Sequence, residues 1–534
     1  MPTVAVSRSE LFNGIDQGEP LHDDSFEHLC FEFGIELDDV ICELELPAGV
    51  KGKGDLLVTG PDGRTITTKV DSAMEAGQIV EVELLMGCCN RGETLQCEFV
   101  GKKWSVTDPT VIYKIDVPAN RSDLLCHEGL VLSLRVFRGI MPTPVFGGLA
   151  TPRDSMLKMS VAPQTGLIRP HVVCAVLRGV SLDQARFDSF IKLQEKLHFN
   201  IARRRSLVAI GTHDLDKVSA PFTYEALPPT DISFVPLKQT EVFTAAELME
   251  LYLDTTKMAG KQLREYVPLI YDSPVYPVIY DAERTVLSLP PVINGSVSAV
   301  SVATKNIFIE CTAVDRTKAD VVLSTLVCLF SQYCDAPFSV EQVEVTYEAT
   351  GKVEVTPNLA SWQSEASLDY INTLVGERLS ADTVCSLLER MQLSAAYDGA
   401  RGKVVVQVPP TRSDILHACD IAEDVAIAYG YNKIRVQLPQ VCAAGEPQPV
   451  GLLTELLRVE IAALGFSEVL ALGLCSHDEN FAHFRTAEVD GTRAVVLDNP
   501  KVSVLYVYRY ILRESCSQFD SLPLTSLTIQ DPRV

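Results

Sequence analysis

The stretch VQVPPTRSDILHACDIAEDVAIAYGYN, residues 406–432, predicts a strand followed by an amphipathic helix. A β-branched run favours the strand, and Pro409 and Pro410 end it because proline supplies no N–H to a ladder. From Asp414 to Tyr429 the apolar residues follow the i, i+3, i+4 spacing of a buried helical stripe. Ser413 or Asp414 is placed to cap this helix, because a side-chain oxygen there can accept from first-turn N–H groups.

Four carboxylates lie close together on this predicted helix or at its start. Carboxylates at such spacing repel one another, and a hard cation with oxygen ligands, such as Mg²⁺, would relieve the repulsion. The alternative is a solvated acidic face near a helix N-terminus, where the helix dipole favours negative charge. Spacing alone leaves both interpretations open for the four residues, which are Asp414, Asp420, Glu423 and Asp424.

The same phrase occurs a second time, nearer the N-terminus. VPANRSDLL at 117–125 matches VPPTRSDIL at 408–416, with a constant offset of 414 − 123 = 291. Each phrase follows a strand-like run and leads into an apolar helix. We therefore expect two copies of one module on either side of a larger region. The first copy keeps only Asp123, with Glu128 nearby, so we expect it to pack rather than to bind metal.

Composition and charge restrict the class of protein. The chain has 534 residues, enough for about three to five domains. It has neither a membrane-length apolar run nor the apolar core of a signal peptide, so we expect a soluble, cytoplasmic protein. Its 15 cysteines lack paired CxxC spacing and are expected to be reduced thiols. The net charge of −24 means that an RNA partner would need a local basic surface or another subunit.

Changes in hydrophobic periodicity and turn signals along the chain suggest four regions. Within an N-terminal module, residues 1–145, a PDG turn between β-branched runs predicts a hairpin in a β-rich stretch at about 47–108. An error in the sequence is the alternative for this stretch. Residues 160–345 alternate strand-like runs with helices and predict an α/β domain. Residues 360–437 hold the second copy, and an amphipathic helix opens the last region, 450–534.

The larger region holds the strongest candidates for chemistry. Thr212, His213 and Asp214 follow an apolar strand that we expect to end at Ile210, with Gly211 giving freedom to turn. Polar side chains at such a strand end are common in sites, and a histidine beside a carboxylate can orient and activate a water. The alternative is that Thr212 and Asp214 cap a turn and that His213 is an ordinary surface residue.

Three other features could contact a ligand. Asn294 and Gly295 could form a turn that presents backbone N–H groups, or an ordinary hairpin turn. Glu310 lies among apolar neighbours, where a carboxylate must be paired, be protonated or serve a ligand, unless it points outward. The arginines at 203–205 could hold phosphates or could be a solvated helix end. Since no phosphate loop or ATP-binding arginine motif occurs, we do not expect this chain to bind ATP by itself.

Five phrases, in order along the chain, carry a family resemblance: MPTVAVSRSELF at 1–12, YKIDVPANRSDLL at 113–125, VAIGTHDLD at 208–216, PPVINGS at 290–296 and PPTRSDILHACDIAEDVAIAYGYN at 409–432. They resemble the beta subunit of cytosolic phenylalanyl-tRNA synthetase of the archaeal and eukaryotic type. The resemblance covers about residues 1–46 and 109–502, and the family has a shorter connection between these parts, so that 47–108 is expected to be an insertion. The resemblance fails after LDNPK, so that the end of the chain is expected to be truncated or alternative.

The resemblance implies an α+β multidomain fold. A mixed α/β editing domain of B3/B4 type, residues 160–345, would be flanked by the two related small helix–strand modules. The second module, residues 360–437, would be winged-helix-like and of B5 type. A partial domain with the fold of a class II synthetase, residues 450–534, would follow without catalytic residues.

The resemblance also implies roles and partners. The chain would join an alpha subunit in an α₂β₂ phenylalanine–tRNA ligase, in which the alpha subunit binds ATP and charges tRNA-Phe. The middle domain would hydrolyse tRNA-Phe mischarged with tyrosine, because a pocket for phenylalanine rejects tyrosine only partly. A scaffold with an inactive editing fold, or an aberrant truncated product, are the alternatives. The implied residues are His213, Asp214 and Thr212 for catalysis, Glu310 for the phenol hydroxyl, Asn294, Gly295 and Arg204 for substrate, and Asp414, Asp420, Glu423 and Asp424 for Mg²⁺.

Overall fold

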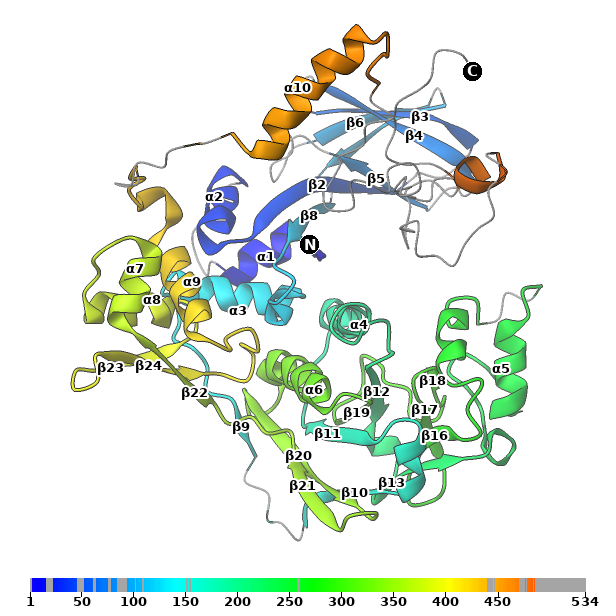
Figure 1. The fold of residues 1–534 in the computed structure, drawn as a ribbon. Coiled ribbons are helices and arrows are strands. Elements are labelled where there is room, and N and C mark those ends of the chain that lie inside the picture. Colours follow the sequence, from blue (N-terminus) through cyan, green and yellow to red (C-terminus); the bar gives the residue numbers. More distant parts are fainter. Residues whose placement is uncertain are drawn as a thin grey trace. The chain divides into compact units, whose positions relative to one another are not determined.

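The structure is a computed structural model of the chain (Figure 1). It describes residues 2–15, 23–45, 52–60, 64–74, 78–83, 94–100, 102–107, 110–149, 152, 155–256, 260–438, 445, 447–469, 476, 478–483 and 485. The chain divides into two compact units, Met1–Arg435 and Val436–Val534. The expectation of a divergent C-terminus after about residue 502 lies outside the described residues.

The N-terminal module is a four-stranded antiparallel sheet with helices packed against it. The sheet has the order β1-β8-β2-β5, and Val4, Tyr113 and Ile115 are among the side chains that it buries against the helices. Alternate residues of β1 and β8 are buried, as expected for strands with one face on a core. The elements are β1 (Thr3–Ser7), β2 (Glu36–Glu45), β5 (Ile79–Glu83), β8 (Thr110–Asp116), α1 (Arg8–Ile15), α2 (Asp23–Phe33) and α3 (His127–Phe137).

A second four-stranded antiparallel sheet is formed by strands that lie between β2 and β8 in the sequence. Its order is β4-β3-β6-β7, and Thr59 pairs with Thr65, on either side of the PDG sequence. The predicted hairpin is therefore confirmed, and the described part of 47–108 folds as β structure. Leu56, Val58, Leu95 and Phe99 supply its buried side. The strands are β3 (Gly52–Thr59), β4 (Thr65–Met74), β6 (Thr94–Phe99) and β7 (Lys102–Thr107).

The middle of the chain forms one long mixed sheet. Its strand order is β12-β19-β11-β20-β10-β13-β16-β17-β18, with β9 and β21 also paired to β20. Helices α4 and α6 lie side by side over the β12, β19 and β11 end (Figure 1), while α5 packs its apolar face near β16 and β17.

The strands of this sheet are β9 (Gly147–Gly148), β10 (Leu157–Val161), β11 (His171–Leu177), β12 (Val208–Asp214), β13 (Phe222–Leu227), β16 (Tyr276–Tyr280), β17 (Val286–Leu289), β18 (Ile293–Asn294), β19 (Ile307–Ala313), β20 (Ser339–Tyr347) and β21 (Lys352–Thr356). Two short strands, β14 (Ser233–Phe234) and β15 (Phe243–Thr244), pair separately. The helices are α4 (Gln184–Phe199), α5 (Ala245–Leu253) and α6 (Arg316–Phe330). The hydrophobic pattern predicts helices over 187–197, 245–252 and 319–333, and each is found within three residues of these bounds.

The third module is a three-stranded sheet, β22-β24-β23, covered by three helices. The sequence predicts a capped helix that begins at Ser380, and in the structure Ser380 accepts a hydrogen bond from the backbone N–H of Thr383 and so caps α8. The predicted start of the last helix at Asp414 is wrong, since α9 begins at Ala418 after a turn. The elements are β22 (Trp362–Ser367), β23 (Ser394–Asp398), β24 (Lys403–Val408), α7 (Leu368–Val375), α8 (Ala381–Arg390) and α9 (Ala418–Tyr429).

The two Arg-Ser-Asp turns repeat in structure as well as in sequence. In each, the arginine Nε and Nη2 donate to both carboxylate oxygens of the aspartate two residues later, at 2.9 and 2.7 Å for Arg121–Asp123 and 3.0 and 2.7 Å for Arg412–Asp414. The following helices begin at His127 and Ala418, which are 418 − 127 = 291 positions apart. The repeat of the Arg-Ser-Asp turn is therefore confirmed, whereas the sheets of the two modules differ, with four strands in the first and three in the third.

The second unit is described only in part. Its main element is α10 (Pro449–Ala463), as the amphipathic pattern predicts, and Leu452, Leu456 and Val459 are exposed on it. Most of the predicted class II-like region, 450–534, lies outside the described residues. In the part of the chain that the structure describes, no helix is long and apolar enough to span a bilayer.

Candidate functional site

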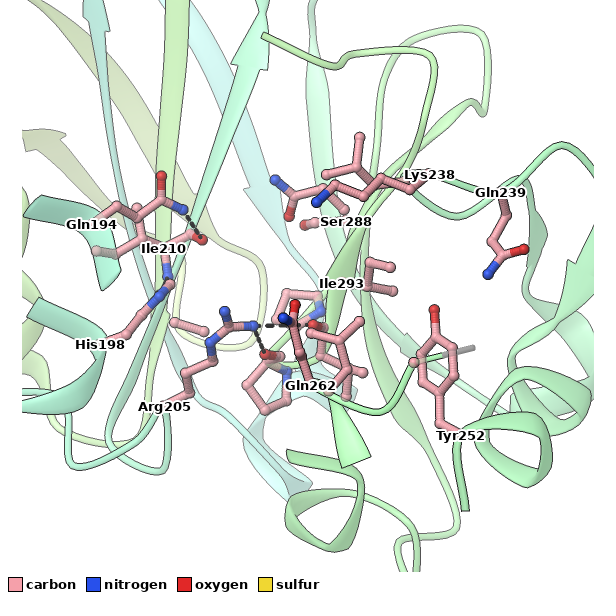
Figure 2. Close-up of a pocket in the computed structure, with 18 of the residues that line it drawn as sticks. Gln194, His198, Arg205, Ile210, Lys238, Gln239, Tyr252, Gln262, Ser288 and Ile293 are labelled. Atoms are coloured by element: carbon pink, nitrogen blue, oxygen red, sulfur yellow. Dashed lines mark hydrogen bonds between the residues drawn. The ribbon is translucent and has the colours of Figure 1, made fainter. Parts of the chain in front are cut away.

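A cavity of about 430 Å³ opens in the middle domain, between the β12 edge of the sheet and the segments around α5 and β18 (Figure 2). Gln194, His198 and Arg205 form one wall in this view, and Tyr252 and Gln239 lie on the opposite side. The volume is in the range of small-molecule sites. The lining mixes apolar and polar groups; its other residues are Ala209, Ile210, Leu237, Lys238, Gly260, Lys261, Gln262, Leu263, Ser288, Pro290, Pro291, Val292, Ile293, Asn294 and Glu310.

Glu310 is the one carboxylate in this lining. It lies on β19 with 1% of its surface exposed, and the Ser288 hydroxyl donates to its Oε1 at 2.8 Å. Its Oε2 is buried and has no hydrogen-bond partner among the described residues. A buried carboxylate oxygen without a donor is costly, so this atom is suited to accept a hydrogen bond from a ligand. The alternative that Glu310 points outward is wrong.

Gly211 makes room for this carboxylate. It pairs with Glu310 across β12 and β19, and a Cβ on residue 211 would lie 2.1 Å from Glu310 Oε1. Gly211 is therefore required by a close approach inside the strand. The predicted turn at Gly211 is wrong, because β12 continues to Asp214.

Replacing Gly211 with alanine should displace the Glu310 carboxylate, since the new methyl group cannot share its space. We expect Gly211→Ala to lower any activity that depends on Glu310 by about tenfold or more, the equivalent of one lost charge-assisted hydrogen bond. Gly166→Ala is the matched control, because nothing lies within 4 Å of a Cβ at that position. Equal activity of the two variants would contradict the role given to Gly211.

His213 lies behind Glu310 rather than in the lining. The ring is completely buried, its Nδ1 is 2.8 Å from the Ser298 hydroxyl, and its Nε2 is 3.8 Å from Glu310 Oε1. His213 lies on β12 beside the Glu310 carboxylate and is not among the residues that line the cavity. This geometry suits a residue that positions Glu310. The alternative of an ordinary surface histidine is wrong.

Thr212 and Asp214 are also absent from the lining. The Thr212 hydroxyl is 3.5 Å from Gln194 on α4. The Asp214 carboxylate accepts a hydrogen bond from the Thr304 hydroxyl at 2.9 Å and forms an ion pair with Lys217 at 2.9 Å. It also accepts a hydrogen bond from the backbone N–H of Asp216. These contacts fit the structural alternative for Asp214, in which the side chain organises the turn after β12.

Asn294 lines the cavity, but the predicted Asn-Gly turn is wrong. Asn294 lies in β18 and pairs with Ser288, and the hairpin turn is formed by the residues at 290–292. The backbone N–H of Gly295 donates to Leu287 O at 2.8 Å. That group is therefore satisfied within the sheet and is not presented to a ligand.

Of the three consecutive arginines, Arg205 rather than Arg204 faces the cavity. Arg204 is exposed, lies over the Phe199 ring and is 3.9 Å from Glu265. Arg205 Nη1 donates to the carbonyls of Pro291 and Val292 at 3.2 and 3.1 Å. Both arginines have positive φ, so the chain here turns in the left-handed region, which the sequence does not signal because glycine is absent.

His198 is a lining residue that sequence patterns did not single out. Its Nε2 accepts from the backbone N–H of Ile210 at 2.8 Å, which places the ring proton on Nδ1 in the neutral form. Burial, together with the charges of Arg205 and Arg169, holds the pKa of His198 well below its ordinary value of 6.5. This wall of the cavity therefore carries an uncharged imidazole at neutral pH.

The low pKa of His198 predicts acid sensitivity. The unfolded chain takes up a proton at His198 near pH 6.5 and the folded chain does not, so the stability from neutral His198 is present above that pH and lost below it. We expect a slope of up to about 1.4 kcal/mol per pH unit below about pH 6.5. Unfolding midpoints of wild type and His198→Gln across this range measure it. Exposed His28→Gln is the control, and identical slopes in all three proteins would refute the assignment.

The four carboxylates proposed for Mg²⁺ do not form one donor set as they lie. Arg412 is completely buried between Asp414 and Asp424, with its Nη2 at 2.7 Å from both carboxylates. Asp420 accepts from the backbone N–H groups of Leu416 and His417 at 2.8 and 2.7 Å and so caps α9. The predicted cap at Ser413 or Asp414 is therefore wrong.

Glu423 is the fourth member, and it is exposed on α9. Within the described ranges, no group of three or more His, Cys, Asp or Glu side chains is arranged to hold a metal ion. The guanidinium of Arg412, rather than a cation from solution, neutralises the two carboxylates that lie closest together. The present arrangement does not fit a metal ion bound by this chain alone.

Comparisons with known proteins agree on one family. A relative named phenylalanine–tRNA ligase beta subunit, cytoplasmic, from Arabidopsis thaliana, is 46% identical over 504 residues, which cover 94% of this chain and 74% of that protein. The chain belongs to the phenylalanine–tRNA ligase beta-subunit family. A beta subunit from Homo sapiens is 42% identical over 512 residues, which cover 96% of this chain and 77% of the relative. The predicted resemblance is thus confirmed.

Family models and a solved structure extend this result. The Phe-tRNA synthetase beta subunit B1 domain matches residues 1–72 and 93–140, the B3/4 domain matches 183–329, and the tRNA synthetase B5 domain matches 364–431. An N-terminal fragment of the phenylalanyl-tRNA synthetase beta subunit from Pyrococcus horikoshii superimposes with a TM-score of 0.61 at 29% identity, covering 80% of this chain and 99% of the fragment.

The family models also place the stretch 47–108 and the cavity of this beta-subunit chain. Most of the stretch expected as an insertion, 47–108, lies inside the B1 match, and only 73–92 falls between its two parts. The cavity belongs to the B3/4 region, since most of its lining lies within 183–329.

Proposed function

We propose that this chain is the non-catalytic beta subunit of a cytoplasmic phenylalanine–tRNA ligase. Its similarity to named beta subunits over nearly its whole length supports this. An alpha subunit would complete an α₂β₂ assembly, bind ATP with Mg²⁺ and charge tRNA-Phe. The large negative net charge fits a division of labour in which the partner subunit holds much of the RNA.

We further propose that the B3/4 cavity hydrolyses tRNA-Phe that carries tyrosine. The observation that carries this proposal is the buried Oε2 of Glu310, which lacks a donor beside a cavity of suitable size. A phenol hydroxyl supplies that donor and the phenylalanine ring does not. A site built to hydrogen-bond a hydroxyl discriminates strongly against the analogue that lacks it, which is what a second sieve requires.

In hydrolysis a water molecule forms a bond to the tyrosyl carbonyl carbon and loses a proton, and the ribose oxygen takes up a proton as it leaves. The reaction breaks the bond between the tyrosyl carbonyl carbon and the ribose oxygen, and a hydroxyl of the terminal ribose can assist the transfer of the proton. In this proposal Asn294 and Arg205 contact the substrate, and His213 acts through Glu310 as a positioning residue. Direct catalysis by Thr212, His213 or Asp214 would need a movement of β12, because none lines the cavity.

Mg²⁺ binding at Asp414, Asp420, Glu423 and Asp424 remains a prediction for the assembled enzyme. Exposed Glu423 and the cap residue Asp420 are the members available to a partner chain, whereas Asp414 and Asp424 are held by Arg412. A cation shared with the alpha subunit would draw on the first two. Mg²⁺ titration of the complex, with Glu423→Gln compared with wild type, would test this.

Deacylation of Tyr-tRNA-Phe by the complex with the alpha subunit tests the editing proposal. We expect hydrolysis by wild type, a large loss in His213→Asn because Glu310 loses its neighbour, and a smaller loss in Asp214→Asn. Charging with phenylalanine should be unchanged in both variants. A complex that charges tRNA normally but never deacylates Tyr-tRNA-Phe would favour the alternative of a scaffold with an inactive editing fold.

A further inference from the structure

The charges that line the cavity are unbalanced. Three side chains are cationic, Arg205, Lys238 and Lys261, and one, Glu310, is a carboxylate. Among the residues that the structure describes, no carboxylate lies within ion-pair distance of Arg205, Lys238 or Lys261. In a chain with a net charge of −24, a cavity with surplus positive charge calls for an anionic ligand.

Arg205 is held in place with one edge open. Its Nη1 donates to two main-chain carbonyls, and its guanidinium lies 4.2 Å from the centre of the Tyr266 ring. Arg169 fixes the left-handed turn by donating to the carbonyls of Arg205 and Ser206. The Nη2 group of Arg205 donates to no described residue, so a rigid guanidinium offers a free N–H edge.

The two lysines lie on the exposed side of the same cavity. Lys238 has a positive φ of 65°, in a turn fixed by the bond from Leu237 N to Asn294 O at 2.9 Å. Lys261 is also exposed. Glu310, by contrast, is 1% exposed. The cavity thus has a cationic outer side and an acceptor at its buried base.

We propose that Arg205, Lys238 and Lys261 form a phosphate-binding subsite for the 5′-phosphate of the terminal nucleotide of an aminoacylated RNA whose tyrosyl group reaches Glu310. The proposal rests on the proposed editing function and deepens it. Arginine binds phosphate through planar, charge-assisted hydrogen bonds, and lysine adds point charge. The carboxylate at the base repels the same phosphate, so the two ends of the cavity fix the direction in which the substrate enters.

The test uses a pair of non-hydrolysable ligands, 3′-tyrosylamino-3′-deoxyadenosine with and without a 5′-monophosphate. Their binding to the αβ complex is measured after the alpha subunit's site has been filled with a phenylalanyl-adenylate analogue. We expect wild type to prefer the phosphorylated ligand by about tenfold or more at low salt, because charged hydrogen bonds are strong. The preference should shrink as salt rises.

Arg205→Met should bring the two affinities close together, while Arg204→Met, its exposed neighbour outside the cavity, should leave the ratio unchanged. If Arg205→Met disturbs folding through Pro291 and Val292, the double variant Lys238→Met/Lys261→Met replaces exposed side chains only and should still reduce the ratio. Equal binding of both ligands by wild type, or an unchanged ratio in Arg205→Met and in the double variant, would overturn the subsite.

The two levels of the proposal fail differently. Phosphate preference without deacylation of Tyr-tRNA-Phe would refute editing and keep the subsite. Deacylation without phosphate preference would refute the subsite and keep editing. If neither ligand binds to the wild-type complex, both proposals are refuted.

Discussion

Glu310→Gln is expected to abolish most deacylation of Tyr-tRNA-Phe while leaving the charging of tRNA with phenylalanine intact. The substitution keeps the size of the side chain and removes the negative charge that would accept the phenol hydroxyl at the base of the cavity. A hydrogen bond to a charged group contributes about 1.5–3 kcal/mol, so kcat/KM for deacylation should fall by about 10- to 100-fold. Single-turnover deacylation by the assembled enzyme measures the effect.

Two comparisons make this result specific. Glu341→Gln, at a buried carboxylate on β20 that pairs with Arg178 away from the cavity, is the control and should keep its deacylation rate. Wild type should discriminate between Tyr-tRNA-Phe and Phe-tRNA-Phe, and Glu310→Gln should lose most of that discrimination. An unchanged ratio between the two substrates would mean that Glu310 does not recognise the hydroxyl.

Arg412→Met should destabilise the third module more than any surface change. The substitution removes a fully buried guanidinium and leaves Asp414 and Asp424 without their partner. Breaking a buried ion pair from one side costs about 3–5 kcal/mol. Denaturant unfolding followed by Trp362 fluorescence, in a Trp104→Phe background, reports on this module because Trp362 lies in β22.

Arg401→Ala provides the control for this measurement. Arg401 pairs with Glu365 in the same module, but its side chain is 52% exposed, so the loss should be within about 1 kcal/mol. The defect of Arg412→Met should become smaller in mild acid, because the freed carboxylates can take up protons. Burial already raises the pKa of Asp424 to about 6 in the wild type, even beside Arg412. Equal losses for the two variants would contradict the buried-pair assignment.

Patterns of local origin were predictable from the sequence. The helices α4, α5, α6 and α10, the PDG hairpin and the Ser380 cap follow from periodicity and turn chemistry within a few residues. The repeated phrase, whose copies are 291 positions apart, could be recognised because it is nine residues long and stands in the same context both times. Glu310 could be singled out because a carboxylate in an apolar strand needs an explanation.

The features that could not be predicted from the sequence depend on contacts between segments that are distant along the chain. Arg205 reaches the cavity because the chain after α4 passes through a left-handed turn of non-glycine residues, and no local signal marks such a turn. The strand β12 continues past Gly211 without a bend. Glycine occurs there because the Glu310 carboxylate on the neighbouring strand occupies the space that a Cβ would need. The carboxylates of the third module looked like metal ligands because the sequence cannot show that Arg412 folds in between them.

The Arg-Ser-Asp turns bear on how such a chain could arise. Because each arginine finds its carboxylate two residues away, a copy of the segment carries its own neutralising charge wherever it is inserted. A gene duplication would therefore deliver a buried cation that is already paired, with no second mutation needed elsewhere. The later divergence is visible at one helical position, where the first copy has Ser133 and the second has Asp424 (424 − 133 = 291). At this position the first copy makes a neutral hydrogen bond to Gln392, and the second copy supplies a second acidic partner for its arginine.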